Sequence, residues 1–242
     1  MNPLENETTD FTLATEAFRH ARLQATLKNM RDGVPDEYGI WIPGPLWWAW
    51  NCTETFDNHW LAKMLAGPYH PFPRLPYMPW LFWQFLRQKH LFIPKSREMM
   101  VSWAVMVYCV WFCMLFERTL VLVQSQKLEK SCELVKGTEP PGYARTLWER
   151  QSQWLRERFP LAARMDDLPA DRLAWENGSA IQAIGKGADQ VRMYHPTIFV
   201  MDEAAHMDEA EASFGAALPV SQQIVVVSSA GPGWFASVCA PE

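Results

Sequence analysis

The chain has 242 residues, and hydrophobic residue types make up 49% of them, which is enough to bury a sizeable core. Its formal net charge of -5 counts against a protein that coats nucleic acid by bulk electrostatics, because such proteins are usually basic. Any contact with nucleic acid must therefore be local, or be made by other parts of a larger assembly. The five cysteines form no CxxC pair, which favours buried free thiols over a zinc site.

The N-terminal part of the chain differs in composition from the rest. Residues 14–30 show the apolar spacing of a helix, which Asp32 and Gly33 end. Residues 34–80 are irregular and rich in proline and tryptophan. These tryptophans could stack on nucleic-acid bases, but few basic residues lie between them, so a small helical subdomain packed by its own tryptophans is favoured. We expect residues 1–75 to form a helical or irregular appendage, and residues 76–242 to form the main domain.

From residue 80 onward, short apolar strands alternate with helices. We predict helices over 80–89, 102–116, 128–136 and 143–158, and strands over 90–93, 119–123, 197–201 and 224–227. Asn177-Gly178 predicts a hairpin between residues 172–176 and 179–184. This order predicts an α/β fold with three layers, in which helices cover both faces of a mostly parallel sheet. Residues 99–116 carry no charge and could span a membrane, but a core helix has the same pattern and is the favoured interpretation.

The first candidate site lies between the strand at 90–93 and the following helix. Lys95 opens this loop and Ser102 begins the helix, so an ammonium and a hydroxyl flank free backbone N–H groups that suit a phosphate. The loop is not a standard Walker A, since Met100 and Val101 stand where that motif has Gly-Lys. On its own, this pattern also fits a surface loop with two basic residues.

Two further strands end in polar residues. Asp202 and Glu203 follow the strand at 197–201, where one carboxylate can hold Mg²⁺ and the other can orient or deprotonate water, as in a Walker B motif. An acidic pair at a helix N-terminus is the ordinary alternative. Ser228 and Ser229 end the strand at 224–227, and a hydroxyl there can sense a γ-phosphate. We expect the Lys95 loop and the acidic pair to face each other across adjacent strand ends.

Together these segments resemble the motifs of tailed-phage large terminases. Residues 95–103, K-S-R-E-M-M-V-S-W, are similar to the displaced Walker A of that family, which often reads K-S-R-Q-x-G-x-S-W. Residues 191–205 are similar to its Walker B region, and residues 228–235 to its coupling motif. The resemblance covers roughly residues 75–240. It implies a P-loop NTPase of the additional-strand, catalytic-glutamate type, which hydrolyses ATP to drive double-stranded DNA into a capsid.

The resemblance also implies a role for single residues. Lys95 would bind phosphate, Ser102 and Asp202 would hold Mg²⁺, Glu203 would be the catalytic base, and Ser229 would lie in the coupling motif. The remaining nucleotide-binding positions of the loop would be Ser96, Arg97, Glu98, Met99, Met100 and Val101.

Three assignments have competing interpretations. Arg192 matches an arginine that acts in trans on a neighbouring subunit, and Arg97 is the rival acting in cis. For both, an ordinary surface salt bridge is the alternative. Gln84 is a candidate for contacting adenine, although a solvated helix face explains it as well.

The sequence departs from the family pattern at two points. Met100 stands where the family usually has glycine, which permits a positive φ and a close approach of the backbone to phosphate. We also find no second, RNase H-like nuclease domain in this chain. The implied partners are DNA, a portal protein, a small terminase subunit and further copies in a ring, at the procapsid in the host cytoplasm and without a membrane. The alternatives are a helicase-like ATPase and a catalytically degenerate prophage remnant with a structural role.

Overall fold

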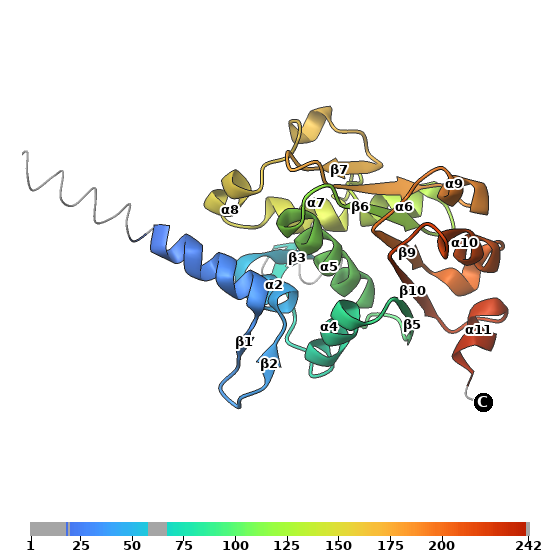
Figure 1. The fold of residues 1–242 in the computed structure, drawn as a ribbon, viewed down its shortest axis with the longest axis horizontal. Helices are drawn as coiled ribbons and strands as arrows, with labels where there is room; N and C mark the ends of the chain where they lie inside the picture. The colour runs from blue at the N-terminus through green and yellow to red at the C-terminus, as the bar shows by residue number, and fades with distance from the viewer. Residues whose placement is uncertain (1–17, 19, 58–66, 241–242) are drawn as a thin grey trace, which may run out of the picture.

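One six-stranded sheet forms the centre of the chain (Figure 1). The computed structural model describes residues 18, 20–57 and 67–240. In spatial order the strands are β5 (His90–Lys95), β10 (Gln223–Ser229), β9 (Ile198–Asp202), β6 (Leu120–Gln124), β8 (Ala180–Ile184) and β7 (Arg172–Ala174). The first five run parallel, while β7 pairs antiparallel with β8 across the predicted Asn177-Gly178 turn. The expected mostly parallel sheet and its hairpin are confirmed.

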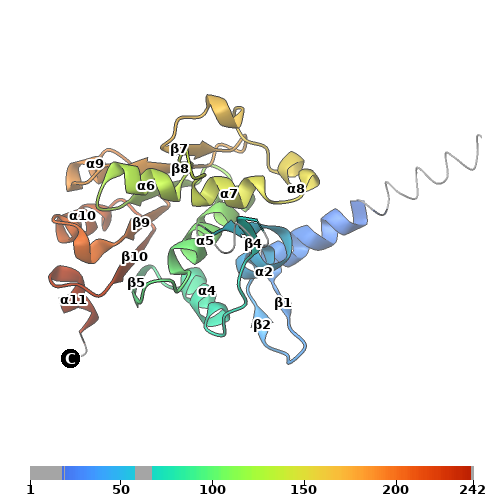
Figure 2. The ribbon, with the colours of Figure 1, turned by 180° about the vertical axis from the view of Figure 1, so that it is seen from behind.

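Helices cover both faces of this sheet, so its strands are apolar on both sides. Val121 and Val123 of β6 point into one core, and Leu122 between them points into the other. Around the first core lie α5 (Val101–Leu115), α6 (Leu128–Leu134) and α7 (Tyr143–Glu149). Around the second lie α9 (Ala188–Arg192), α10 (Ala210–Ala217) and α11 (Trp234–Cys239) (Figures 1 and 2). This is the three-layer architecture that the alternating pattern predicted.

Helix α5 is the uncharged segment that could have been a membrane span. It lies between the sheet and the N-terminal region, and its Val107, Cys109 and Cys113 are fully buried. Burial raises the pKa of both thiols above their usual range, as expected for free cysteines in a core. Among the described residues, no helix combines the length and the hydropathy that crossing a bilayer requires.

The N-terminal region packs against α5 rather than standing apart. Residues 18 and 20–32 are helical, and residues 14–17 and 19 of the predicted helix lie outside the described residues. The region continues with β1 (Val34–Pro35), β2 (Trp41–Ile42), α2 (Gly44–Cys52), β3 (Glu54–Phe56), β4 (Tyr69–Pro71) and α4 (Met78–Arg87). The indole of Trp111 on α5 donates to the carbonyl of Met30 at 2.6 Å. The boundary at residue 75 stays a prediction, because both sides of it share one hydrophobic cluster.

The tryptophans of this region serve mainly in packing. Trp48 is fully buried, and the indole of Trp50 donates to the carbonyl of Pro73 at 3.2 Å. Trp41 and Trp80 are exposed, and Trp60 lies outside the described residues. A subdomain packed by its own tryptophans therefore accounts for Trp47, Trp48 and Trp50, which all pack in the first core.

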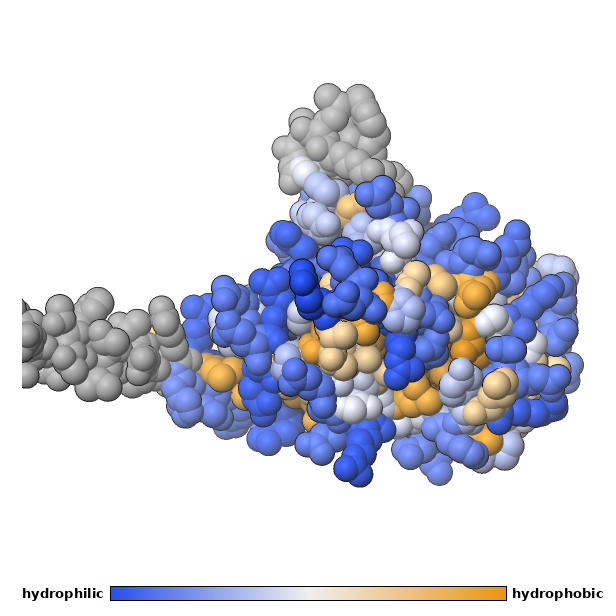
Figure 3. Space-filling model, turned by 90° about the horizontal axis from the view of Figure 1, so that it is seen from above, coloured by the Kyte–Doolittle hydropathy of each residue, from blue (hydrophilic) through white to orange (hydrophobic). Residues whose placement is uncertain are grey.

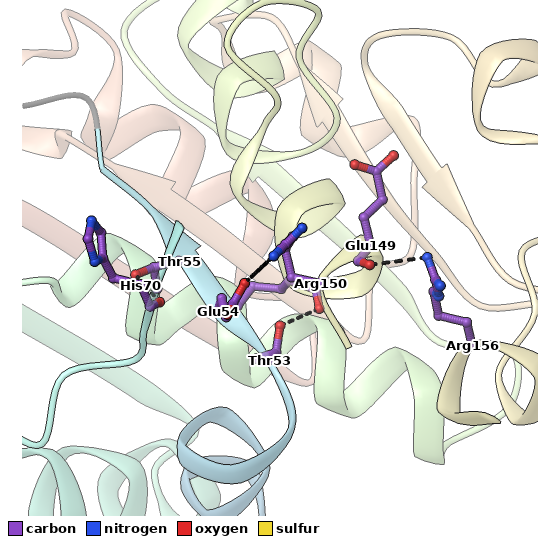
Figure 4. A network of polar contacts seen from close by, with 8 residues as sticks. Thr53, Glu54, Thr55, His70, Glu149, Arg150 and Arg156 are labelled. Carbon is purple, nitrogen blue, oxygen red and sulfur yellow. Dashed lines mark hydrogen bonds and ion pairs between the residues drawn. The ribbon is translucent and has the colours of Figure 1, made fainter. Parts of the chain in front are cut away.

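Polar contacts fix the β3–β4 hairpin onto α7. Glu54 of β3 forms an ion pair with Arg150 at 2.6 Å, and the hydroxyl of Thr53 donates to the carbonyl of Leu147 at 2.6 Å (Figure 4). The guanidinium of Arg150 also lies 4.2 Å from the ring centre of Tyr69 on β4. The hairpin is thereby held against the C-terminal end of α7.

The predicted helix over 143–158 is wrong in one respect, because it is two helices. After α7, the chain passes through Arg150 and Gln151, and α8 (Gln153–Arg158) begins after Ser152. Ser152 has ψ 150°, an extended conformation that interrupts the helical hydrogen bonds, and serine favours such N-cap positions.

Hydrophilic residues cover most of the surface seen from above, with apolar residues in smaller patches between them (Figure 3).

Candidate nucleotide site

The candidate residues collect where the parallel strands β5, β10 and β9 end. Lys95 is the last residue of β5 and Asp202 the last of β9. Strand β10 lies between them, with Ser229 paired to Lys95 and Val227 paired to Asp202. The expectation that the Lys95 loop and the acidic pair follow adjacent strands is therefore wrong, since an additional strand separates them. All three strands nevertheless deliver their carboxyl ends to the same edge of the sheet.

A pocket of about 720 Å³ opens at this edge. It brings together Lys95, Ser102, Asp202 and Glu203, four residues that the sequence analysis singled out. The predicted loop residues Glu98, Met99, Met100 and Val101 line it too. The volume suits a ligand of nucleotide size.

Ser102 and Asp202 are in direct contact. The hydroxyl of Ser102, in the first turn of α5, donates to Oδ1 of Asp202 at 3.0 Å. Asp202 is buried, and this burial raises the pKa of its carboxyl to about 6, although the Ser102 hydrogen bond and the Lys95 ammonium act in the opposite direction. This hydrogen bond thus joins two motifs that lie 100 residues apart in the sequence.

The phosphate loop has an unusual backbone. Met100, the N-cap of α5, has φ 54° and ψ 15°, and Glu98 has φ 63°. Glycine adopts this left-handed region freely, whereas a side chain there costs about 1–2 kcal/mol. The hydroxyl of Tyr77 donates to the carbonyl of Met99, which holds the middle of the loop. Met100 therefore occupies the conformation for which the family's glycine is suited.

The segment after Asp202 is held by the end of β10. Glu203 has φ 60°, which turns the chain into the short helix η2 (Ala204–His206). The backbone N–H of Ala205 donates to the hydroxyl of Ser228 at 3.0 Å, and Nε2 of His206 lies 3.2 Å from the hydroxyl of Ser229. The predicted coupling strand and Glu203, the predicted catalytic base, are therefore linked through η2.

Several residues of the pocket were not predicted from the sequence. Tyr143 of α7 lines it and stacks on Trp103 of α5, with ring centres 4.0 Å apart and planes inclined by 4°. The pKa of Tyr143 is raised by burial, and then by the nearby carboxylates. The opposite wall comes from the β3–β4 hairpin and the segment after it, through Thr55, Phe56, Asp57, His70, Pro71, Pro73 and Leu75. No local signal marks these positions, because long-range packing brings them to the site.

Other predicted residues lie outside the pocket lining. Gln84, on α4, accepts a hydrogen bond from the amide of Gln88 at 3.1 Å, and nothing in this geometry supports its contact with adenine. Arg192 is exposed on α9 and pairs with Asp189 at 2.6 Å. Ser96 and Arg97 are exposed at the edge of the loop. The lining thus contains neither candidate arginine.

The charge of the lining bears on what the pocket can bind. Its carboxylates are Asp57, Glu98, Glu133, Asp202 and Glu203, and its ammonium groups are Lys95 and Lys130. Lys130 is already paired with Glu133 at 2.8 Å. An anionic ligand therefore needs added positive charge in this pocket, from a cation or from another chain.

The donor set fits Mg²⁺ better than a metal held by protein alone. In the described part of the chain, no three His, Cys, Asp or Glu side chains cluster in a way that could hold a metal ion. Ser102 and Asp202 offer two adjacent oxygens. Mg²⁺ is commonly bound by one or two protein oxygens together with phosphate and water, which is the arrangement these two residues permit.

Comparison with known proteins identifies the fold. The sequence matches no protein-family model and no curated protein. An arginine-to-alanine variant of the large terminase ATPase domain of Thermus phage P74-26 is 16% identical, covers 69% of either chain and superposes with a TM-score of 0.50. The chain has the fold of a phage large-terminase ATPase domain. The additional strand expected from the sequence is β10, which lies between β5 and β9.

Two other solved structures are similar. The unmodified domain from the same phage is 14% identical, covers 69% of either chain and has a TM-score of 0.49. The large terminase of a second thermophilic bacteriophage, in complex with ADP, is 11% identical, covers 60% of this chain and 34% of its own, and has a TM-score of 0.40. At these identities the likeness to the terminase ATPase domain is one of fold.

Proposed function

We propose that the chain is the ATPase subunit of a viral DNA-packaging motor, which hydrolyses ATP and translocates double-stranded DNA into a capsid. One observation carries the proposal: Lys95, Ser102, Asp202 and Glu203 line a single pocket, with the Ser102 hydroxyl hydrogen-bonded to Asp202. The fold supports it, because it is similar to that of a phage large-terminase ATPase domain. The four residues lie in the segments that resemble the Walker A and Walker B motifs of that family.

The phosphates would lie over the loop between β5 and α5. Helix α5 has 15 residues, and its first N–H groups and its dipole favour an anion at this end. Lys95, at the end of β5, would place its ammonium on the outer phosphates. The apolar wall formed by Phe56, Pro71, Leu75 and Met99 would receive the base, in the role first considered for Gln84.

Ser102 and Asp202 would hold Mg²⁺ between them. When bound, this ion neutralises charge on the β- and γ-phosphates. Burial of Asp202 fixes its carboxylate beside the Ser102 hydroxyl, so both oxygens are already in place before ligand arrives. Glu203, one residue later and half-buried, would orient the attacking water and accept its proton.

The acidic lining supports action in an assembly. Because Arg97 and Arg192 both lie outside the lining, the arginine that neutralises the γ-phosphoryl group would have to approach it. Arg192 is exposed on α9 and is paired with another exposed side chain, so it would contact a neighbouring copy without first leaving the protein interior. We therefore propose a homo-oligomeric ring, which would act on a portal with a small terminase subunit, and Arg192 as its trans-acting arginine.

An ATPase assay with and without double-stranded DNA tests the proposal on the wild type and on Glu203→Ala. The proposal expects hydrolysis that DNA stimulates and that the variant loses. Stimulation by single-stranded DNA with strand separation would instead indicate a helicase-like enzyme. Absence of turnover in every condition would indicate a degenerate, structural protein, which the left-handed Met100 favours as the second candidate.

A further inference from the structure

The contact between η2 and the tip of β10 is the feature of the site that the four nucleotide-binding residues do not explain. Two residues of η2 and three around the tip of β10 take part. Ala205 donates its N–H to the hydroxyl of Ser228 at 3.0 Å, and Nε2 of His206 lies 3.2 Å from the hydroxyl of Ser229. At Gly231, an added Cβ would come within 3.0 Å of the Cβ of Ala205 and 3.3 Å of the imidazole Cε1 of His206.

The two segments are otherwise independent of each other in backbone pairing. Strand β10 pairs with β9 only as far as Val227 and Asp202, so its last two residues extend beyond that ladder. On its other side, Ser229 is the register partner of Lys95. The serine that contacts His206 therefore belongs to the backbone beside the phosphate-binding lysine.

The backbone conformation of Glu203 depends on the turn of η2 after it. Its φ of 60° and ψ of 38° lie in the left-handed region, which an acidic side chain occupies only when the surrounding structure holds it there. The N–H of His206 donates to the carbonyl of Glu203 at 2.9 Å, closing one turn of η2. A residue that anchors His206 thus anchors the carbonyl of Glu203, the proposed catalytic base.

We propose that His206 is a positioning residue, which fixes the backbone carrying Glu203 to the tip of β10 through the hydroxyl of Ser229. The proposal rests on the proposed function in one respect only, namely that Glu203 performs the hydrolytic step. A series of contacts would then run from Lys95 through Ser229 and His206 to Glu203, and it would connect the phosphate loop with the acidic pair. Movement of the β10–α11 loop would then shift Glu203 without touching the nucleotide.

The enzymatic test compares His206→Ala, His206→Gln, Ser229→Ala and the double variant His206→Ala/Ser229→Ala. Loss of one hydrogen bond predicts that kcat falls about tenfold in each alanine variant while the nucleotide Kd stays the same. His206→Gln should recover much of the rate, because its amide can reach the same hydroxyl. The double variant should be no slower than the slower single variant, since both remove the same contact.

His195→Ala is the matched control, because His195 is also exposed but precedes β9 at the opposite end of the strand. It should leave kcat unchanged. The proposal would be overturned if the reductions in kcat of the two single variants multiplied in the double variant. It would also be overturned if KM rose by the same factor as kcat fell.

Amide hydrogen exchange tests the contact without any turnover. In the full chain without nucleotide, Ser229→Ala should speed exchange in residues 203–207, and His206→Ala should speed it in residues 228–231, with the melting temperature unchanged. Absence of this reciprocal effect would overturn the connection itself. If the effect is present but wild-type protein hydrolyses no ATP, the connection stands and the proposed function fails.

Discussion

The two halves of the pocket are built differently. The acidic half, from Asp202 to His206, is fixed by hydrogen bonds with the side-chain hydroxyls of Ser102, Ser228 and Ser229. The phosphate-loop half, from Lys95 to Met100, contains two non-glycine residues at positive φ and is held mainly by Tyr77. Both halves carry backbone strain, since Glu203 in the acidic half also has φ 60°. Several hydrogen bonds with side chains hold the acidic half, whereas the phosphate loop depends mainly on the one from Tyr77. Substitutions in each half can test this difference.

The largest effect should come from the acidic half. Glu203→Gln keeps the shape of the side chain but removes the proton acceptor, so kcat should fall roughly 10²- to 10⁴-fold. Nucleotide affinity should change little, because the ligating oxygens of Ser102 and Asp202 remain. Steady-state hydrolysis and equilibrium binding of a fluorescent ATP analogue measure the two effects. A variant that keeps more than half of the wild-type rate would exclude Glu203 as the base.

In the phosphate-loop half, Lys95→Ala should weaken ATP binding roughly 10- to 100-fold, which is the loss expected for a charge-assisted hydrogen bond. Lys130→Ala is the control, because Lys130 lines the same pocket but is paired with Glu133. Isothermal titration with Mg²⁺-ATP measures both. Equal losses in the two variants would mean that the pocket attracts nucleotide by its overall charge and not through Lys95.

The pH dependence of stability isolates the buried carboxylate. Because burial raises the pKa of Asp202 from 3.8 to about 6, the folded chain binds more protons than the unfolded chain between these values. The free energy of unfolding should therefore fall as pH rises through that window, by roughly 3 kcal/mol from this group. In Asp202→Asn, the free energy of unfolding should not show this decrease with pH. Urea titrations at several pH values, without metal or nucleotide, measure it.

The exposed carboxylate of Asp208 supplies the comparison for that experiment, since its side chain is 90% exposed. Asp208→Asn should keep the wild-type dependence on pH. If both variants behave like the wild type, the polar partners of Asp202 outweigh its burial.

The smallest effect should come from the strained loop. Met100→Gly removes the cost of a side chain at φ 54° and should tighten nucleotide binding about threefold to tenfold, because the backbone can then approach phosphate. Arg118→Gly relieves a similar φ of 55° at the opposite edge of the sheet, and should leave binding unchanged. Tighter binding in both variants would indicate a general effect of stability.

The sequence predicted the strands and the polar residues at their ends well, because both depend on local patterns. The apolar runs at 197–201 and 224–227 are visible without any partner, and so are the acids and serines that come after them. Strand order was not predictable in this way. Whether β10 lies beside β9 only or between β9 and β5 depends on long-range pairing, which leaves no mark in the strand itself.

The pocket wall shows the same limit. Thr55 and His70 lie in β3 and β4, in a segment that was expected to be irregular. Their position depends on the ion pair of Glu54 with Arg150, almost a hundred residues later. The break at Ser152 was missed because the apolar spacing continues across it. At Met100 the sequence identified the position, but only the structure gives the conformation that its side chain must tolerate.

The burial of α5 on two sides has a consequence for protein engineering. Its apolar surface faces the sheet on one side and α2 and residues 20–32 on the other, where Trp111 reaches the carbonyl of Met30. A shortened protein that starts at residue 76 would uncover tryptophan and valine side chains directly behind the nucleotide loop. Such a fragment should aggregate, so the amino-terminal segment has to accompany the catalytic half whenever it is transplanted or fused.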